Sequence, residues 1–408
     1  MQFVPLEQFP PGAVIQPTAP YILMAMAQRR QSMKHLIAER MERLAGDAAD
    51  TAALMDLALI WQLYGERDHA LAYQNHALGR CRLFLDPAPK ETALRLLCLM
   101  APGDLTINQP VELLVHGRDI TLIKLYLAPG ETFPETIPEH DAVLVAVSEY
   151  DHTRPILEYL SGALDGWPRP VINRPQGILK PGRDEAARLL EDAPGLAVPG
   201  TVRWSAEDVS RVVDGGLLAD DAFPLIVRPV GTHAGKGMVK VDDRAGLAAY
   251  RDQVVAGGWY NIAPFVDYRA ADGHYRKYRV AVIDGRPFVC HVAISDKWMV
   301  HYGSSGMEQT PWKRDEEARR MEVFDLDFVP RHRAAFDAMT ERLGLDYIVL
   351  DCAETADGLL LYFEADNAGA VHDLDPPDLF PYKLPQMRRI FDAFESLVVK
   401  IAGTGGTQ

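Results

Sequence analysis

The chain has 408 residues, a formal net charge of −15 at pH 7, 48% hydrophobic residues and 24% charged residues. This length predicts roughly two to four domains, and the composition is that of a globular protein. The negative charge argues against nonspecific nucleic-acid binding, which needs a basic surface, but it permits a local basic site for an anionic ligand.

The cysteines and the N-terminus bear on the compartment. Cys81, Cys98, Cys290 and Cys352 are widely spaced, form no CxxC pair and are expected to be reduced and buried. No basic segment followed by a long apolar stretch begins the chain, and the apolar run at 21–27 is too short to span a membrane. We therefore expect a cytoplasmic protein that acts neither on nucleic acid nor in a membrane.

Residues 20–100 are predicted to be helical, because apolar residues recur at spacings of three and four. Residues 61–89 match one tetratricopeptide unit at Trp61, Gly65, Ala77 and Pro89. Such repeats normally stack, so a helical hairpin packed on the next domain is the alternative. The sequence leaves open whether this region binds a protein partner, self-associates or only packs.

The sequence after this helical region has a different pattern of apolar residues. Short apolar runs at 111–117, 121–128 and 141–149 predict strands, and 153–164 predicts a helix. Strands that alternate with helices favour a small α/β domain with a parallel sheet, whose last strand is predicted at 169–175.

The remaining elements follow from the same patterns. Helices are predicted at about 183–192, 334–343 and 384–402, and strands or hairpins at 223–230, 261–267, 275–295 and 345–366. Another helix is expected to start near Asp242 or Asp243, which would cap it. The charged run at 313–320 is predicted to be a solvated helix face.

Three carboxylates near the C-terminus form the strongest constellation. Two apolar runs flank a turn signal at Asp357–Gly358, which predicts a hairpin. With that turn, Asp351 lies opposite Glu364, and Asp366 shares the face of Glu364. Opposed like charges repel, so a cation is expected between them, and oxygen ligands suit Mg²⁺ or Mn²⁺. A polar strand end with splayed carboxylates is the alternative.

The glycine-rich stretch GTHAGKG occupies residues 231–237, after a predicted strand that ends near Arg228. It is one residue too short for a Walker-type phosphate loop. Its glycines allow close backbone approach to phosphate, and His233 and Lys236 add donors, although an ordinary hairpin is the alternative. Together with Arg279 on a later strand and the acidic hairpin, the loop favours a Mg-nucleotide site.

The order of these segments resembles the ATP-grasp carboxylate–amine ligase superfamily, especially its RimK-like and glutathione-synthetase-like branches. The resemblance covers about residues 105–400 and is carried by RPVINRP, LIVRPVGTHAGKG, IAPFVDY, KYRVAVIDGRPF, YIVLDCAE and YFEADNAG. It implies an ATP-grasp fold of mixed α/β and α+β class. The implied domains are a helical region at 1–104, a small α/β domain at 105–178, a lid subdomain at 179–262 and a catalytic subdomain at 263–408.

The resemblance also implies roles for individual residues. Arg228 stands where the family usually has a phosphate-contacting lysine, and Arg279 where a strand arginine contacts the γ-phosphate. Asp351 and Glu364 match the magnesium carboxylates. The third ligand is Asp366 or Asn367, and Asp366 is favoured because it shares a face with Glu364. The implied ATP contacts are His233, Gly235, Lys236 and Gly237 in the lid loop, and Pro264, Phe265 and Val266, with Asp267 nearby, at the adenine.

The implied reaction uses ATP and Mg²⁺ or Mn²⁺ to convert a small-molecule or peptide carboxylate into an acyl phosphate, which an amine then attacks. The candidates for substrate contact are His291, Lys297, Trp298 and His301. Lys297 is favoured because a carboxylate needs a cation, whereas His291 and Trp298 could equally be packing residues. The alternatives are kinase-like phosphoryl transfer on the same fold and a noncatalytic nucleotide-binding scaffold. Mutually repelling carboxylates argue against the scaffold.

Overall fold

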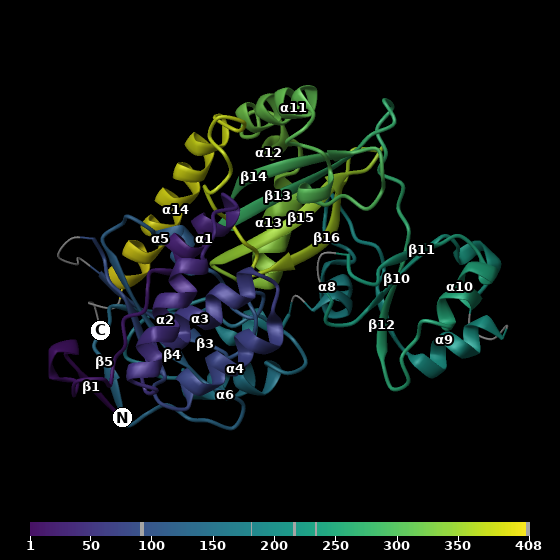
Figure 1. Ribbon diagram of the computed structural model, residues 1–408. Coiled ribbons are helices and arrows are strands. Elements are labelled where there is room, and N and C mark those ends of the chain that lie inside the picture. The colour runs from purple at the N-terminus through teal and green to yellow at the C-terminus, as the bar shows by residue number, and fades with distance from the viewer. Residues whose placement is uncertain (90–93, 181, 215–217, 233–234, 405–408) are drawn as a thin grey trace.

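The computed structural model describes residues 1–89, 94–180, 182–214, 218–232 and 235–404 (Figure 1). The described chain has the predicted mixed α/β architecture, with one mostly parallel sheet, two mostly antiparallel sheets and the helices that cover them. Across these ranges, every helix is too short or too polar to cross a bilayer.

The N-terminal region is helical, as predicted, as far as residue 78. Strand β1 (Gln2–Val4) and the 3-10 turn η1 (Leu6–Gln8) precede the helices α1 (Pro20–Gln28), α2 (Lys34–Gly46), α3 (Thr51–Leu63) and α4 (Arg67–Leu78). Asp50 caps α3, because its side chain accepts a hydrogen bond from the backbone N–H of Ala53 at 3.0 Å. The pair α3 and α4 packs closely, which fixes a helical hairpin at the N-terminal side of the molecule (Figure 1).

The helical prediction is wrong beyond residue 78. Strands β2 (Leu83–Asp86) and β3 (Leu94–Met100) follow α4. A short run such as LRLLCLM, apolar except for Arg95, is compatible with a buried strand or a buried helix, and here it pairs with strands on both sides. The tetratricopeptide match is not confirmed, because 61–89 holds the end of α3, all of α4 and β2. The hairpin packs on the next domain instead: the Gln74 amide exchanges two hydrogen bonds, of 3.0 and 2.7 Å, with the backbone of Gly103.

The small sheet has the order β2-β4-β3-β6-β7. Strands β4 (Ile120–Tyr126), β6 (Ala142–Val145) and β7 (Val171–Ile172) run parallel to β3 or to one another, as predicted, and β2 is an antiparallel edge. Helix α6 (Arg154–Ala163) also confirms its prediction. The sheet thus takes strands from both sides of residue 104, while the predicted domain boundaries themselves stay predictions.

The strand predicted at 111–117 is wrong. Residues Val111–Val115 form the short helix α5, which starts after Pro110 and is buried at every position. A short apolar run that is buried all round carries no periodicity, so it does not distinguish a strand from a helix. Strand β5 (Thr136–Pro138), which pairs in parallel with β1, and helix α7 (Pro175–Ile178) complete this part of the chain.

A second sheet, which we call the lid sheet or the lid, stands apart from the rest of the molecule (Figure 1). Its antiparallel strands have the order β11-β10-β12-β9, with β9 (Val202–Ser205), β10 (Leu225–Pro229), β11 (Val239–Val241) and β12 (Trp259–Pro264). Helices α9 (Ala206–Val213) and α10 (Arg244–Arg251) cover it, with the 3-10 turn η2 (Asp220–Ala222) between them. Asp243, one of the two predicted caps, accepts a hydrogen bond from the backbone of Gly246 at 2.7 Å and so starts α10.

The large sheet has the order β14-β13-β15-β16-β8. The two predicted hairpins are β13 (Tyr275–Ile283) with β14 (Arg286–Ser295), and β15 (Tyr347–Glu354) with β16 (Leu360–Asp366); β8 (Leu196–Ala197) is added in parallel at the edge. Its helices are α8 (Arg183–Leu190), α11 (Pro311–Glu322), α12 (Phe328–Arg331), α13 (Arg333–Leu343) and α14 (Lys383–Thr404), with the 3-10 turn η3 (Tyr302–Ser304).

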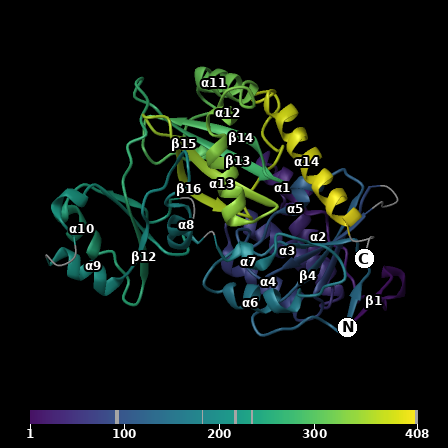
Figure 2. The ribbon, with the colours of Figure 1, turned by 180° about the vertical axis from the view of Figure 1, so that it is seen from behind.

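Helix α14 joins the two larger parts of the molecule. It packs on β13 and β14 of the large sheet and on β6 and β7 of the small sheet, and the view from behind shows it along this shared side, opposite the lid (Figure 2). One hydrophobic core therefore runs through both sheets, from Leu97 and Leu122 to Val280 and Ile390.

The prediction of a solvated helix face at 313–320 is wrong at Glu317. This residue of α11 is fully buried, although most of its neighbours are exposed or half-buried. Its carboxylate accepts hydrogen bonds from the backbone of Val292 at 2.9 Å, from Tyr302 at 2.8 Å and from Tyr382 at 2.6 Å. These donors come from distant parts of the chain, so the charge pattern of the helix alone does not reveal the burial.

Candidate active site

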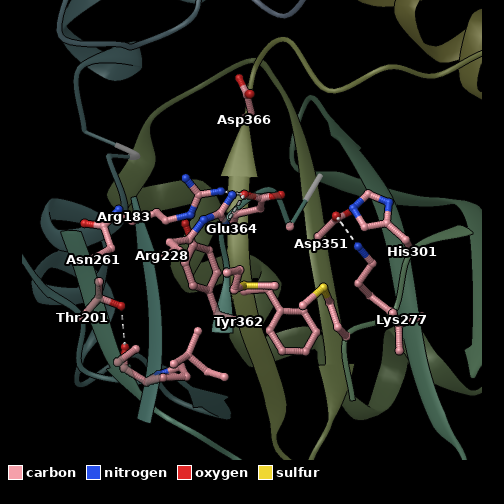
Figure 3. Close-up of a pocket in the computed structure, with 18 of the residues that line it drawn as sticks. Arg183, Thr201, Arg228, Asn261, Lys277, His301, Asp351, Tyr362, Glu364 and Asp366 are labelled. Carbon is pink, nitrogen blue, oxygen red and sulfur yellow. Dashed lines mark hydrogen bonds and ion pairs between the residues drawn. The ribbon is translucent and has the colours of Figure 1, made fainter. Parts of the chain in front are cut away.

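A cavity of about 490 Å³ lies between the lid sheet and the large sheet. Its walls come from β10 and β12 of the lid, from β13, β15 and β16 of the large sheet, and from Arg183 at the start of α8. Figure 3 shows the charged side chains that meet there. The charged lining residues are Arg183, Arg228, Lys277, Arg279, Asp351, Glu364 and Asp366.

Asp351 lies at the centre of one charged group. It is 4% exposed and pairs in register with Arg279 of β13. Arg279 Nε and Lys277 Nζ each donate to its carboxylate at 2.9 Å. Burial alone would raise the pKa of Asp351, but these two cations hold the pKa well below the usual range of aspartate. Asp351 is therefore a carboxylate at any physiological pH.

Glu364 lies at the centre of a second charged group. Arg183 donates a short hydrogen bond to its carboxylate, and Arg228 Nη1 lies 3.9 Å away. The Nη2 of Arg228 donates to the backbone carbonyl of Thr232, but its buried Nε has no hydrogen-bond partner among the described residues. Burial, together with the nearby Arg183, lowers the pKa of Arg228 to about 9. A half-buried arginine with one unused donor is suited to an anionic ligand.

The predicted pairing of Asp351 with Glu364 is confirmed. The predicted two-residue turn is wrong, because Glu354 pairs with Leu360 and a five-residue loop joins them. A register shift directly after Asp351 compensates for the longer turn and restores the predicted pairing. The bulge thus places the two carboxylates on neighbouring strands in front of the cavity.

The three carboxylates do not gather into one cluster. Asp366 lies at the end of β16, apart from Glu364 and Asp351 (Figure 3), and accepts hydrogen bonds from Ser148 Oγ at 2.7 Å and from the backbone of Ala368 at 2.8 Å. In the described ranges, no three His, Cys, Asp or Glu side chains are grouped to hold a metal ion. The structure thus brings Asp351 and Glu364 together on neighbouring strands, whereas metal binding by these carboxylates and Asp366 stays a prediction.

Asn367 is the alternative third ligand from the sequence. It is 1% exposed, and its Nδ2 donates to the backbone carbonyl of Val147 at 3.0 Å. Asp366 lines the cavity, whereas Asn367 is absent from its wall. Asn367 thus ties the hairpin to the small sheet, and Asp366 is the better placed of the two for a ligand in the cavity.

One side of the cavity is apolar. Pro264, Phe265 and Val266, predicted for adenine, line it together with Ile226, Ala263 and Phe363. Phe265 packs edge-on against Trp298, with ring centroids 5.8 Å apart. Asp267, predicted nearby, lies outside the wall and pairs with Arg269 at 2.8 Å. A flat apolar slot of this kind accommodates an aromatic ring.

The glycine loop is only partly at the cavity. Gly235 lines it with φ of +70°, and a Cβ there would lie 2.9 Å from Met299 Sδ, so only glycine fits. A Cβ at Gly237, which also has φ of +70°, would lie 3.0 Å from Pro229. Lys236 is exposed and outside the wall, and His233 lies outside the described residues.

Two of the four predicted substrate residues line the cavity. Trp298 and His301 do, whereas His291 and Lys297 do not. His291 packs on the ring of Tyr302 at 4.5 Å, and Lys297 is exposed. Burial, and then the charge of Lys277, lower the pKa of His301, so its imidazole is neutral at pH 7.

Sequence reasoning missed two cations of the wall, Lys277 and Arg183. Lys277 could have been found, because it lies two residues before Arg279 on a predicted strand and so shares its face. Arg183 carries no such signal, because its partner Glu364 is 181 residues away in the sequence. Asn261 and Tyr362 also line the cavity. They were missed because no pattern in the sequence marks them.

No model of a known protein family matches the chain. The chain is 30% identical over 144 residues to the formate-dependent phosphoribosylglycinamide formyltransferase of Cupriavidus metallidurans, which covers 35% of the chain and 33% of that protein. It is 32% identical over 105 residues to the protein of the same name in Cupriavidus taiwanensis, which covers 26% of the chain and 25% of the relative. The chain thus spans about a third, or less, of the length of these curated relatives.

Solved structures give a distant likeness. The RimK domain protein ATP-grasp of Sphaerobacter thermophilus is 18% identical with a TM-score of 0.41, covering 73% of this chain and 98% of that one. The D-alanyl-alanine synthetase A of Vibrio cholerae is 11% identical with a TM-score of 0.46, covering 77% of this chain and 100% of that one. Scores below 0.5 establish no residue roles. In this chain, the lid sheet and the large sheet line one cavity.

Proposed function

We propose that the chain is an ATP-dependent ligase that activates a carboxylate as an acyl phosphate and joins it to an amine. The observation that carries this proposal is a cavity lined both by four cationic side chains, in two groups around Asp351 and Glu364, and by apolar residues. The Nε of Arg228, in the group around Glu364, has no partner among the described residues. Such a cavity matches a ligand with an aromatic ring and a polyanionic tail.

The charged groups supply what phosphoryl transfer requires. Arg228 and Arg183 would bind phosphate oxygens, and Arg279 would stabilise the negative charge that develops on the transferring group. Arg279 is held in position by Asp351 through two hydrogen bonds, of 2.9 and 3.1 Å.

The carboxylate oxygens at the cavity are suited in part to binding Mg²⁺. Asp351 and Glu364 oppose each other on neighbouring strands and offer the oxygen ligands that Mg²⁺ prefers. Each is already paired with a cation, so we propose that these cations turn to the phosphates when the ion is held. Asp366 is the nearest further oxygen donor, whereas the amide of Asn367 is engaged with Val147. When bound, the ion would neutralise charge on the phosphate oxygens.

The substrate carboxylate would bind at Lys277 in place of Lys297, which is exposed and lies outside the cavity wall. Its oxygen attacks the γ-phosphorus and ADP leaves, which gives the acyl phosphate. The amine nitrogen then attacks the acyl carbon, the C–O bond to phosphate breaks, and the amine loses a proton. The neutral imidazole of His301, at the same wall, is available to accept that proton.

The test is product analysis with small-molecule carboxylates and amines in the presence of Mg-ATP. The proposal expects amine-dependent release of ADP and phosphate together with a new amide detected by mass spectrometry. A phosphorylated product that persists without the amine would instead establish kinase-like transfer. Absence of ATP binding by the folded protein would overturn both functions.

A further inference from the structure

Strand β12 of the lid sheet presents alternate side chains to two different environments. Tyr260 and Ile262 are part of the lid core, whereas Asn261 and Ala263 line the large cavity. Successive side chains of a strand point to opposite faces of the sheet, so Asn261 points away from the lid core and toward the cavity. Figure 3 shows Asn261 at the cavity together with Arg228.

The amide of Asn261 is buried within the protein but open to the cavity. The residue is 8% exposed, and its side chain has no hydrogen-bond partner among the residues that the structure describes. The described wall atoms that lack both a partner and accessible surface are Arg228 Nε and Tyr362 Oη, so the two amide atoms of Asn261 are not sealed off. A buried amide with an unused donor and an unused acceptor indicates a ligand that supplies both.

Other neutral polar side chains of the wall have already used their donors. The Thr201 hydroxyl donates to the backbone carbonyl of Pro199 at 3.1 Å, and the Tyr268 hydroxyl donates to that of Trp298 at 2.7 Å. Within the described part of the lid face, Asn261 is therefore the neutral side chain that still offers both a donor and an acceptor to a ligand.

The strand register places Asn261 between two features of the proposed nucleotide site. Asn261 pairs directly with Arg228 of β10, which would bind phosphate. Ala263, which pairs with Ile226 and lines the apolar slot, follows two residues later on the same face, a distance of about 7 Å along a strand. A ligand that reaches from the slot to Arg228 therefore passes the amide of Asn261.

We propose that Asn261 recognises the base of the nucleotide and selects adenine, an inference that rests on the proposed ATP-dependent function. In the anti conformation of a purine nucleotide, the side of the base that carries N7 faces the phosphates. With the base in the slot and the phosphates at Arg228, this side faces Asn261. Asn261 Oδ1 then accepts a hydrogen bond from the N6 amino group of adenine, and Nδ2 donates to N7.

Guanine does not match this arrangement. It carries the acceptor O6 in place of the amino group, so both O6 and N7 require donors. Asn261 has one NH₂ group and one carbonyl, and the carbonyl would face an acceptor without a hydrogen bond. The same amide thus favours adenine and disfavours guanine.

The experiment is isothermal titration of the full chain with ATP, 7-deaza-ATP and GTP in the presence of Mg²⁺. In 7-deaza-ATP a C–H group replaces N7, and the rest of the nucleotide is unchanged. We expect the native chain to bind 7-deaza-ATP and GTP each at least about tenfold more weakly than ATP, because one or both hydrogen bonds to Asn261 are lost.

Asn261→Leu tests whether this preference comes from the amide. Leucine has a similar size but offers no hydrogen bond, so the variant should bind ATP and 7-deaza-ATP alike, within about twofold. Asn75→Leu, at an exposed position of α4 outside the cavity wall, is the matched control and should keep the native preference for ATP. A purely structural role of Asn261 would instead weaken both nucleotides equally and leave the preference intact.

The outcomes separate this inference from the proposed function. If the native chain binds ATP and 7-deaza-ATP equally, Asn261 does not recognise N7 and the inference falls, even if Asn261→Leu fails to fold. A preference for ATP that persists in folded Asn261→Leu overturns it as well. In both cases ATP is bound and the proposed function stands. A folded native chain that binds none of the three nucleotides would overturn the proposed function and, with it, this inference.

Discussion

The lid sheet and the large sheet face the same cavity but are held in different ways. The large sheet shares one hydrophobic core with the small sheet and α14, whereas the lid has a small core of its own around Val209, Val227 and Leu247. The cavity wall of the large sheet carries residues locked in ion pairs, such as Arg279 and Asp351. The lid contributes Arg228 with an unpartnered Nε, counted over the described residues. The ion-paired residues of the large sheet thus face a lid sheet whose residues are less constrained.

Arg279→Ala should have the largest effect, because it removes a preorganised cation from the fixed side. We expect a fall in kcat of about 10²–10³-fold with little change in KM for ATP, since the lost contact serves the transition state. Steady-state kinetics of ADP release measure it. Arg286→Ala, at an exposed strand end outside the wall, is the control. A kcat unchanged by Arg279→Ala would remove Arg279 from the mechanism.

Arg228→Ala tests how much the lid sheet contributes to ATP binding. This change removes the buried guanidinium, so we expect the dissociation constant of ATP to rise about 10–100-fold, which corresponds to one or two lost charge-assisted contacts. Isothermal titration with ATP measures it. Because the substitution also removes the hydrogen bond to Thr232 and the contact with Glu364, a thermal melt checks that the variant is folded. Unchanged ATP affinity would contradict the assignment of the anion to this end of the cavity.

Glu317→Gln tests whether residues beneath the cavity also help to hold the wall that belongs to the large sheet. Glu317 binds Tyr302, which directly follows the wall residue His301. The amide keeps the size but loses the charge and replaces one acceptor with a donor, so the loop at 298–302 should shift. We expect KM for the acceptor substrate to rise about tenfold with KM for ATP constant, and Glu322→Gln on the same helix to be neutral. Equal kinetics for both variants would limit Glu317 to a structural role.

The local register of the site could be predicted from sequence, and its long-range partners could not. The turn position predicted that Asp351 lies opposite Glu364, and that pairing survived a longer turn because a bulge corrected the register. The predicted third ligand, in contrast, depends on Ser148 and Val147, just after β6, which form hydrogen bonds with Asp366 and Asn367.

The fold, like the site, depends on long-range partners that could not be predicted from the sequence. Strand β3 fell within the helix predicted from apolar spacings of three and four, and only pairing with β4 and β6 decides between helix and strand for this short run. The burial of Glu317 likewise depends on Tyr302 and Tyr382. Spacing within one segment predicts the face of a residue, but not which distant polar group will meet that face.

Val227→Ala and Val280→Ala compare the two cores directly. Both side chains are fully buried, the first in the lid core and the second in the main core. Each truncation should cost about 1–2 kcal/mol. Hydrogen exchange should show Val227→Ala accelerating exchange in the lid strands only, whereas Val280→Ala should accelerate it in the large and small sheets together. Accelerated exchange throughout the chain in both variants would show that the lid and the main body unfold as one unit.

Lys236→Ala should have the smallest effect, although the sequence around it looks most like a phosphate loop. Its side chain is exposed and outside the cavity wall, whereas Gly235 lines the wall. A solvated ammonium group contributes little to binding at physiological ionic strength. We therefore expect the dissociation constant of ATP to change less than about threefold, against the larger change for Arg228→Ala, in titrations under identical salt. A loss as large as that of Arg228→Ala would mean that the lid closes far enough over the nucleotide to bring Lys236 onto the phosphates. The less constrained core of the lid would then be the feature that permits this closure.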